Sequence, residues 1–214
     1  LLIALLIRVA GKNPALSVLL TFAIPAMAGL AKHFNVAGGF WEYLMAFIIS
    51  RAEWSYFPFI PWAGWVMAGF SLALLEEKYV GWFEKRKSFL IYAILAAGVP
   101  VVMFIPWASG ITSDLPAYYH HGFPFFIWGL LFLALWAALG RLLQSYFGRT
   151  WLLAYIRWLG RNVTLAYMMQ WLIIGNMATA IYQSQAAFMF PVHFVSVLLG
   201  TTIIVWLAVR LRKG

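Results

Sequence analysis

Seven apolar stretches constrain the fold of this chain more than any other feature. Most of them match the roughly 20 residues that an α-helix needs to cross the hydrocarbon core of a bilayer. They cover residues 1–10, 14–31, 57–75, 88–107, 122–144, 162–183 and 188–209. Only 10% of the residues are charged, whereas soluble domains carry about a quarter. The sequence therefore predicts an all-α polytopic transmembrane helix bundle, with about six complete spans and a truncated first span.

The remaining composition narrows the class of protein and its partners. No repeat, linker or low-complexity tract is present, so residues 1–214 are expected to form a single transmembrane domain. Because the chain opens on an apolar stretch without a basic leader, we expect it to be the C-terminal part of a longer protein. The absence of cysteine excludes disulfides and thiolate chemistry. No soluble basic domain carries the net charge of +9, so the lipid bilayer, and not nucleic acid, is the expected partner.

Lysine and arginine residues alternate between the connections that join these stretches. The first, third and fifth connections and the C-terminal tail hold thirteen of the fifteen, and the even connections hold only Lys32 and Arg51. Cytoplasmic loops of membrane proteins are enriched in positive residues. The pattern predicts that the odd connections and the C-terminus lie in the cytoplasm. Residues 33–56, which carry aromatic residues at helical spacing, are predicted to form a short interfacial helix on the outer surface.

Three polar residues of the sixth apolar stretch fall within one arc of a helix. Asn162, Tyr167 and Gln170 share an arc of about 140° at 100° per residue. Polar groups inside a span usually face protein or a water-filled cavity. We expect Tyr167 and Gln170, together with Trp62 of the third stretch, to line a substrate cavity. Alternatively, these side chains join neighbouring helices, and Asn162 is also a candidate N-cap.

The loop "SDLPAYYHHGFP" is the richest in titratable side chains on the predicted outer face. A carboxylate orients an imidazole and stabilises its protonated form, so Asp114 with His120 or His121 suits general base catalysis. A metal site would need a third ligand, recruited from His33 or Glu42, and no metal is predicted. Alternatively, these side chains are ordinary interfacial residues.

Two motifs resemble those of a family of membrane enzymes. The stretch "FPFIPWAGWVMAGFSLAL" resembles the "FPLFPWxGxxxxGxxLG" segment of bacterial membrane proteins related to heparan-α-glucosaminide N-acetyltransferase, within the wider group of integral-membrane acyltransferases. The stretch "LGRNVTLAYMMQW" is similar to the late helix of that group, "LGxxSLxxYxxH", through Gly160, Arg161, Asn162, Leu165 and Tyr167. Gln170 stands where many relatives have histidine, and the "RxxSLDxxRG" opening is absent. The resemblance would cover the chain from about residue 15 to its end.

The resemblance implies transfer of an acetyl or acyl group from cytoplasmic acetyl-CoA to a glycan acceptor outside a bacterial cytoplasmic membrane. Arg157, Arg161 and Asn162 would then bind coenzyme A, although positive-inside anchoring also explains the arginines. An alternative is an accessory or structural subunit of a larger membrane complex, without catalysis of its own, which Gln170 in place of histidine favours. A transporter would need inverted repeats or charged relays, which we do not find in the sequence.

Single cysteines test the predicted topology, because the chain has no native cysteine. A cysteine at Ser109 or Ser184 should react with a membrane-impermeant thiol reagent added to intact cells. A cysteine at Ser88 should react only after the membrane has been opened. Labelling of position 88 alone would show that the orientation is reversed.

Overall fold

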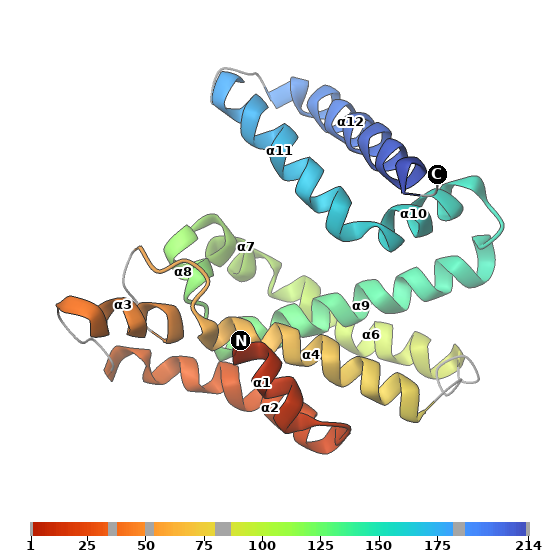
Figure 1. Ribbon diagram of the computed structural model, residues 1–214. Coiled ribbons are helices and arrows are strands. Elements are labelled where there is room, and N and C mark those ends of the chain that lie inside the picture. The colour runs from red at the N-terminus through yellow and green to blue at the C-terminus, as the bar shows by residue number, and fades with distance from the viewer. Residues whose placement is uncertain (1, 34–37, 50–53, 80–86, 182–186, 213–214) are drawn as a thin grey trace. The chain divides into compact units, whose positions relative to one another are not determined.

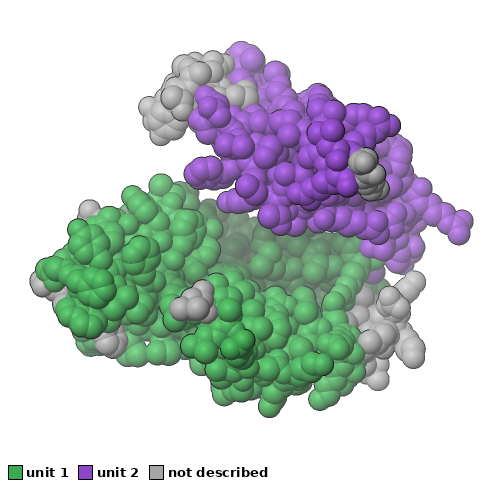
Figure 2. Space-filling view, in the orientation of Figure 1, with its two compact units in different colours: residues 1–141 green, residues 142–214 purple. Residues whose placement is uncertain are grey.

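The computed structural model describes residues 2–33, 38–49, 54–79, 87–181 and 187–212, which form helices and connecting turns with no strand among them (Figure 1). The predicted all-α fold is confirmed. Arg51 and Ser184, which the topology prediction uses, lie outside these residues. The chain divides into two compact units, residues 1–141 (unit 1) and residues 142–214 (unit 2), coloured separately in Figure 2. That the whole chain is one transmembrane domain stays a prediction.

Three of the described helices are long and apolar enough to cross a membrane. They are α4 (Phe59–Lys78), α9 (Phe123–Phe147) and α12 (Phe190–Leu211). A fourth candidate combines most of α6 (Lys87–Met103) with α7 (Ile105–Ser113), which meet at a bend of 58°. These apolar helices indicate a lipid bilayer environment. The number of six complete spans stays a prediction.

Shorter helices complete the two units. In unit 1 they are α1 (Leu2–Ala10), α2 (Pro14–Ala26), the 3₁₀ helix η1 (Met27–His33), α3 (Gly39–Ile48) and α8 (Leu115–Tyr119). In unit 2 they are α10 (Trp151–Arg161), α11 (Val163–Ile181) and the 3₁₀ turn η2 (Ala187–Met189). The helix predicted within residues 33–56 is confirmed as α3, and its interfacial position stays a prediction.

Local sequence explains where several of these helices begin. Asn13 accepts hydrogen bonds from the backbone N–H groups of Ala15 and Leu16 at 3.0 and 3.2 Å, which caps α2, and Pro14 follows without an N–H to satisfy. In α4, Ile60 has non-helical backbone angles (φ −102°, ψ 119°). A proline disfavours helical angles at the residue before it, so Pro61 explains the kink at Ile60.

The antiparallel pair of α2 and α4 is held by small and hydroxylated residues. The Ser71 hydroxyl lies 2.6 Å from that of Ser17 and 2.9 Å from that of Thr21, and all three side chains are buried. Near the other end of the pair, the ring of Pro25 packs directly against the backbone of Gly64. Small residues let helices approach closely in a membrane, where hydroxyl groups can hydrogen-bond across the interface. This interface is therefore built from features suited to lipid as the solvent.

Helices α4 and α9 run in the same direction through unit 1. At their N-terminal ends the rings of Trp65 and Phe126 lie 4.7 Å apart, and towards their C-terminal ends Arg141 forms an ion pair with Glu76. The indole N–H of Trp128 in α9 donates to the Val101 carbonyl of α6 at 3.1 Å, so α6 lies beside α9. Helices α4 and α9 therefore begin at the same side of unit 1, and that this side is the outer one stays a prediction.

Unit 2 is a hairpin of α11 and α12 joined to the shorter α10. A Cβ added to Gly200 of α12 would lie 3.3 Å from Ile173 of α11, so the two helices are in close contact there. The Tyr155 hydroxyl of α10 lies 2.6 Å from the Thr202 hydroxyl of α12. Both contacts lie within unit 2, so they order its three helices independently of unit 1.

Substitution of Gly64 tests the packing of α2 on α4. In Gly64→Ala the added methyl group would overlap the Pro25 ring, so we expect a loss of about 1 to 3 kcal/mol of unfolding free energy. Gly69→Ala, on the same helix with open space around it, is the matched control and should not destabilise. Thermal unfolding in detergent, followed by circular dichroism, measures both. Equal stability of the two variants would contradict this packing.

Candidate functional site

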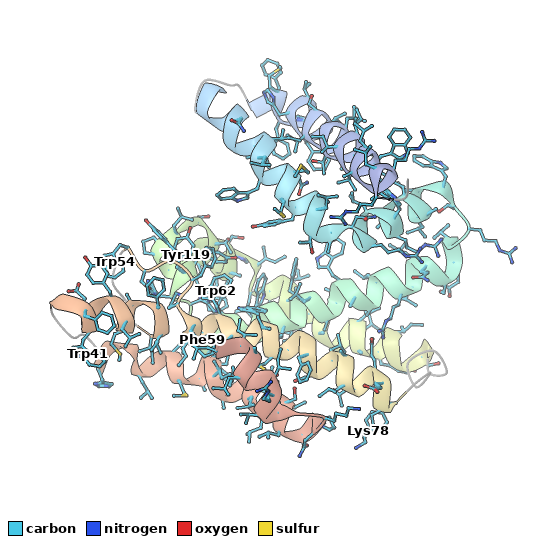
Figure 3. All side chains as sticks on the ribbon, in the orientation of Figure 1. Trp41, Trp54, Phe59, Trp62, Lys78 and Tyr119 are labelled. Carbon is cyan, nitrogen blue, oxygen red and sulfur yellow. The ribbon has the colours of Figure 1, made fainter. Side chains whose placement is uncertain are left out.

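An aromatic cluster forms where the beginning of α4 meets α8 and the beginning of α9. It consists of Trp62, Trp65, Tyr118, His121 and Phe125, and residues 62–65 and 118–125 meet there from distant parts of the sequence. The indole N–H of Trp62 donates to the Tyr119 carbonyl at 2.8 Å. Figure 3 shows Trp62 and Tyr119 beside one another at one end of α4, with Lys78 at its other end. The third apolar stretch thus packs against the loop that carries His120 and His121, which we call the histidine loop.

His121 is the buried centre of the aromatic cluster. Its Nε2 atom accepts a hydrogen bond from the indole N–H of Trp65 at 3.1 Å, and its Nδ1 atom lies 3.0 Å from the Tyr118 carbonyl. An indole can only donate and a carbonyl can only accept, so this arrangement requires the neutral tautomer with its proton on Nδ1. Both ring nitrogens of His121 are therefore already used in holding the fold.

The surroundings of His121 also oppose its protonation. Burial lowers the pKa of His121, the hydrogen bond to the Tyr118 carbonyl raises the pKa, and the nearby positive charge of His120 lowers it again, with a net decrease from 6.5. A base that acts at neutral pH needs an accessible ring nitrogen. His121 is suited to a structural role in this conformation.

The other two predicted catalytic residues lie on either side of α8. Asp114 is exposed, and its Oδ1 atom accepts from the backbone N–H of Ala117 at 3.3 Å, which caps the helix. His120 is the C-cap residue of α8, is half-buried and donates its backbone N–H to the Pro116 carbonyl at 3.1 Å. The structure thus brings the three residues into one short segment. The hydrogen-bond partners of His121, however, are Trp65 and Tyr118, so Asp114 does not orient that imidazole.

Exposed aromatic rings extend the cluster outwards. Tyr56 and Phe57 pack edge-on against Tyr119, with ring centroids 5.1 and 4.8 Å away. Tyr56 and Phe57 are exposed and Tyr119 is half-buried, and we call these three residues the aromatic platform. These three residues are not among the predicted site residues, although the dense aromatic residues of "SYFPF" and "AYYHH" are a signal for such a platform.

The predicted coenzyme A residues lie in unit 2. One guanidinium nitrogen of Arg157 donates to the Gly148 carbonyl at 2.9 Å, and Arg161 is exposed. Asn162 follows α10 as its C-cap, and its side-chain amide donates to the Trp158 carbonyl at 2.9 Å. Its side chain therefore serves the end of α10, while its backbone carbonyl accepts the N–H of Ala166 in α11 at 2.9 Å.

The predicted cavity residues belong to different units, so it stays a prediction that they line one cavity. Tyr167 is 64% exposed and Gln170 is half-buried, both on α11, whereas Trp62 belongs to the aromatic cluster of unit 1. An apolar groove of about 530 Å³ lies between α6, α7 and α9. It is lined by Pro100, Phe104, Trp107, Phe123, Pro124, Ile127, Trp128 and Leu131. None of the predicted site residues lines this groove.

The part of the chain that the structure describes contains no group of three or more His, Asp or Glu side chains that could hold a metal ion. Comparison of the chain with known protein families, curated proteins and solved structures found no match. The resemblance to membrane acyltransferases therefore stays a prediction, and the geometry of the site carries the functional argument.

Acid conditions test the role of His121. The folded-state pKa of His121 is lowered below the unfolded value of 6.5, so the unfolded chain takes up the proton first as the pH falls. The unfolding free energy should therefore decrease as the pH drops from about 7.5 towards 5.5. Thermal unfolding across this range should show a decrease for the wild type and a smaller decrease for His121→Gln.

His33→Gln is the matched control for this experiment, since it removes an exposed histidine from η1. This variant should keep the pH dependence of the wild type. A pH dependence that is equally large in His121→Gln would show that another group causes it.

Proposed function

We propose that the chain belongs to an integral-membrane acyltransferase that moves an acetyl or acyl group from cytoplasmic acyl-CoA to a glycan acceptor on the outer side of a bacterial cytoplasmic membrane. The C-terminus would lie in the cytoplasm. The observation that carries the proposal is the meeting of the "FPFIPWAGW" segment with the histidine loop, since Trp62 and Trp65 donate hydrogen bonds to Tyr119 and His121. The segment that resembles the acyltransferase motif thus holds the titratable loop in place.

The aromatic platform supports a glycan as the acceptor. Tyr56 and Phe57 present exposed rings beside Tyr119, one residue away from His120. The apolar face of a sugar ring packs well against an aromatic face, whose hydrophobic area is large. A sugar on this platform would lie close to the histidine loop.

The proposed chemistry needs a basic side chain other than His121, because His121 has a structural role. His120 is the candidate, because it is half-buried and follows Tyr119 of the aromatic platform, whereas His121 holds the loop through Trp65 and Tyr118. The base would take the proton of an acceptor hydroxyl or amine while the acceptor atom attacks the thioester carbonyl. The tetrahedral oxyanion would then collapse, and the thiolate of coenzyme A would leave and be protonated.

Arginine side chains in unit 2 would bind the donor. Guanidinium groups form charge-assisted hydrogen bonds with phosphates. Arg161 is the principal candidate, because Arg157 already donates to the Gly148 carbonyl. Asn162 lies beside Arg161 at the end of α10.

A second candidate function is that of an accessory subunit without catalysis. The roles of His121 and Asp114 in holding the loop and capping α8 favour it, because they account for two of the three predicted catalytic residues. Gln170 in the place of a histidine points in the same direction.

Coenzyme A binding and acetyl transfer by the purified protein distinguish the two functions. His120→Gln should lower turnover by about 100-fold or more while donor affinity is unchanged. Arg161→Glu should weaken coenzyme A binding by about ten-fold, and more strongly at low salt, where screening is weaker. Arg8→Glu, which changes an exposed arginine of unit 1, is the charge-matched control and should leave donor binding unchanged.

Two results would each contradict one part of the proposal. One is the absence of coenzyme A binding by the wild type, which would favour the accessory subunit. The other is full turnover by His120→Gln, which would remove the proposed base.

A further inference from the structure

Unit 2 carries positive charge without any acidic side chain. All six Asp and Glu residues of the chain precede residue 142. Residues 142–214 contain Arg149, Arg157, Arg161, Arg210, Arg212 and Lys213. No acidic residue within unit 2 can neutralise these charges, so the unit is suited to an anionic partner.

The described arginines gather at one end of unit 2. Gly200 of α12 packs against Ile173 of α11, and the two helices run in opposite directions. Arg210 lies ten residues after Gly200, and Val163 lies ten residues before Ile173. Both distances are about 15 Å along a helix, so Arg210 and Val163 lie level with one another. Val163 begins α11 directly after Arg161 and Asn162. Figure 1 shows the end of α12 beside α10, in agreement with this register.

Helix α10, at the same end, is amphipathic and has exposed apolar residues. Trp151 is 80% exposed, and Leu152 and Ile156 are also exposed. At 100° per residue these three residues fall on one side of the helix, opposite Arg157 and Arg161. Tyr155 falls within the same arc, and its hydroxyl ties the helix to Thr202 of α12. Trp151, Leu152 and Ile156 nevertheless keep half or more of their surface exposed.

We infer that α10 lies at the membrane–water interface and that the arginines around it bind the headgroup phosphates of anionic phospholipids. An amphipathic helix with aromatic and aliphatic residues on one side and arginines on the other is the usual form of an interfacial helix. Arginines near a membrane surface attract anionic lipids. A soluble polyanion would satisfy the arginines but would leave Trp151, Leu152 and Ile156 in water, so a phospholipid is the partner that fits both sides.

The arginines of unit 2 differ in their contacts and exposure. The Arg157 guanidinium is bonded to the Gly148 carbonyl, which holds the turn that carries Arg149. The Arg210 guanidinium lies 4.5 Å from the centre of the Trp206 ring, so this arginine is held against an aromatic side chain. Arg161 and Arg212 are exposed and are the residues to substitute. This inference does not depend on acyl transfer, because it needs no donor and no catalytic residue.

A fluorescent label on α10 tests the inference in the full chain, which has no native cysteine. Bimane attached to Leu152→Cys would be measured in phosphatidylcholine nanodiscs with a minority of phosphatidylglycerol. Bromine atoms near the headgroup end of the acyl chains would be placed on one lipid or on the other. Quenching per brominated lipid should be about three-fold stronger for phosphatidylglycerol, because the arginines enrich it around α10.

Substitution and position controls make the result specific. The double variant Arg161→Gln and Arg212→Gln should bring the quenching ratio close to one, whereas Arg8→Gln in unit 1 should leave it unchanged. A label at Val99→Cys, an exposed position of α6, should be quenched equally by both lipids.

Two outcomes would overturn the inference. Absence of quenching by both lipids at position 152 would show that α10 lies outside the interface. Equal quenching by both lipids at position 152, unchanged in the double variant, would show that the arginines do not select anionic headgroups. Because coenzyme A is absent from this experiment, either outcome is distinct from a failure of the proposed acyl transfer.

Discussion

The hydrogen bond from the Trp65 indole to His121 is the interaction on which the candidate site of unit 1 depends. It ties α4 to the turn between α8 and α9, and the bond between His121 and the Tyr118 carbonyl continues it into α8. A buried imidazole with both nitrogens satisfied holds its position firmly, because loss of either partner would leave an unpaired polar group. The aromatic platform and His120 are positioned by this arrangement, so the proposed chemistry depends on a histidine that takes no part in it.

Contacts elsewhere in unit 1 follow from lipid as the expected solvent. Apolar side chains gain little when they leave hydrocarbon for another helix, so association relies on close packing and hydrogen bonds. Gly64 against Pro25 and the hydroxyl group of Ser71 between Ser17 and Thr21 are of this kind. Gly129, which the Trp65 ring covers, extends the same principle to α4 and α9. Many large apolar side chains consequently remain on the surface of the described helices, as a bilayer permits.

Hydropathy predicted the helical fold and most of the long helices, because every backbone polar group in a membrane must be satisfied within the helix itself. It missed α10, since Arg157 and Arg161 interrupt residues 151–161 and leave no continuous apolar stretch long enough to cross a membrane. For that reason the sequence predicts Asn162 as a candidate N-cap of the following helix. In the structure its side chain bonds instead to the Trp158 carbonyl at the end of α10. Trp65 and His121 are 56 positions apart, and single-sequence patterns carry no information about a partner at that distance. The candidate site was therefore predicted as a set of residues and not as an arrangement.

A double-mutant cycle on Trp65 and His121 tests the central interaction most directly. The unfolding free energies of Trp65→Phe, His121→Gln, the double variant and the wild type would be measured in the same detergent at neutral pH. Residues that share a buried hydrogen bond should show a coupling energy of about 1 kcal/mol, so that the double variant loses less stability than the sum of the single variants. Additive losses would contradict the account, because they would show that the two side chains stabilise the fold independently.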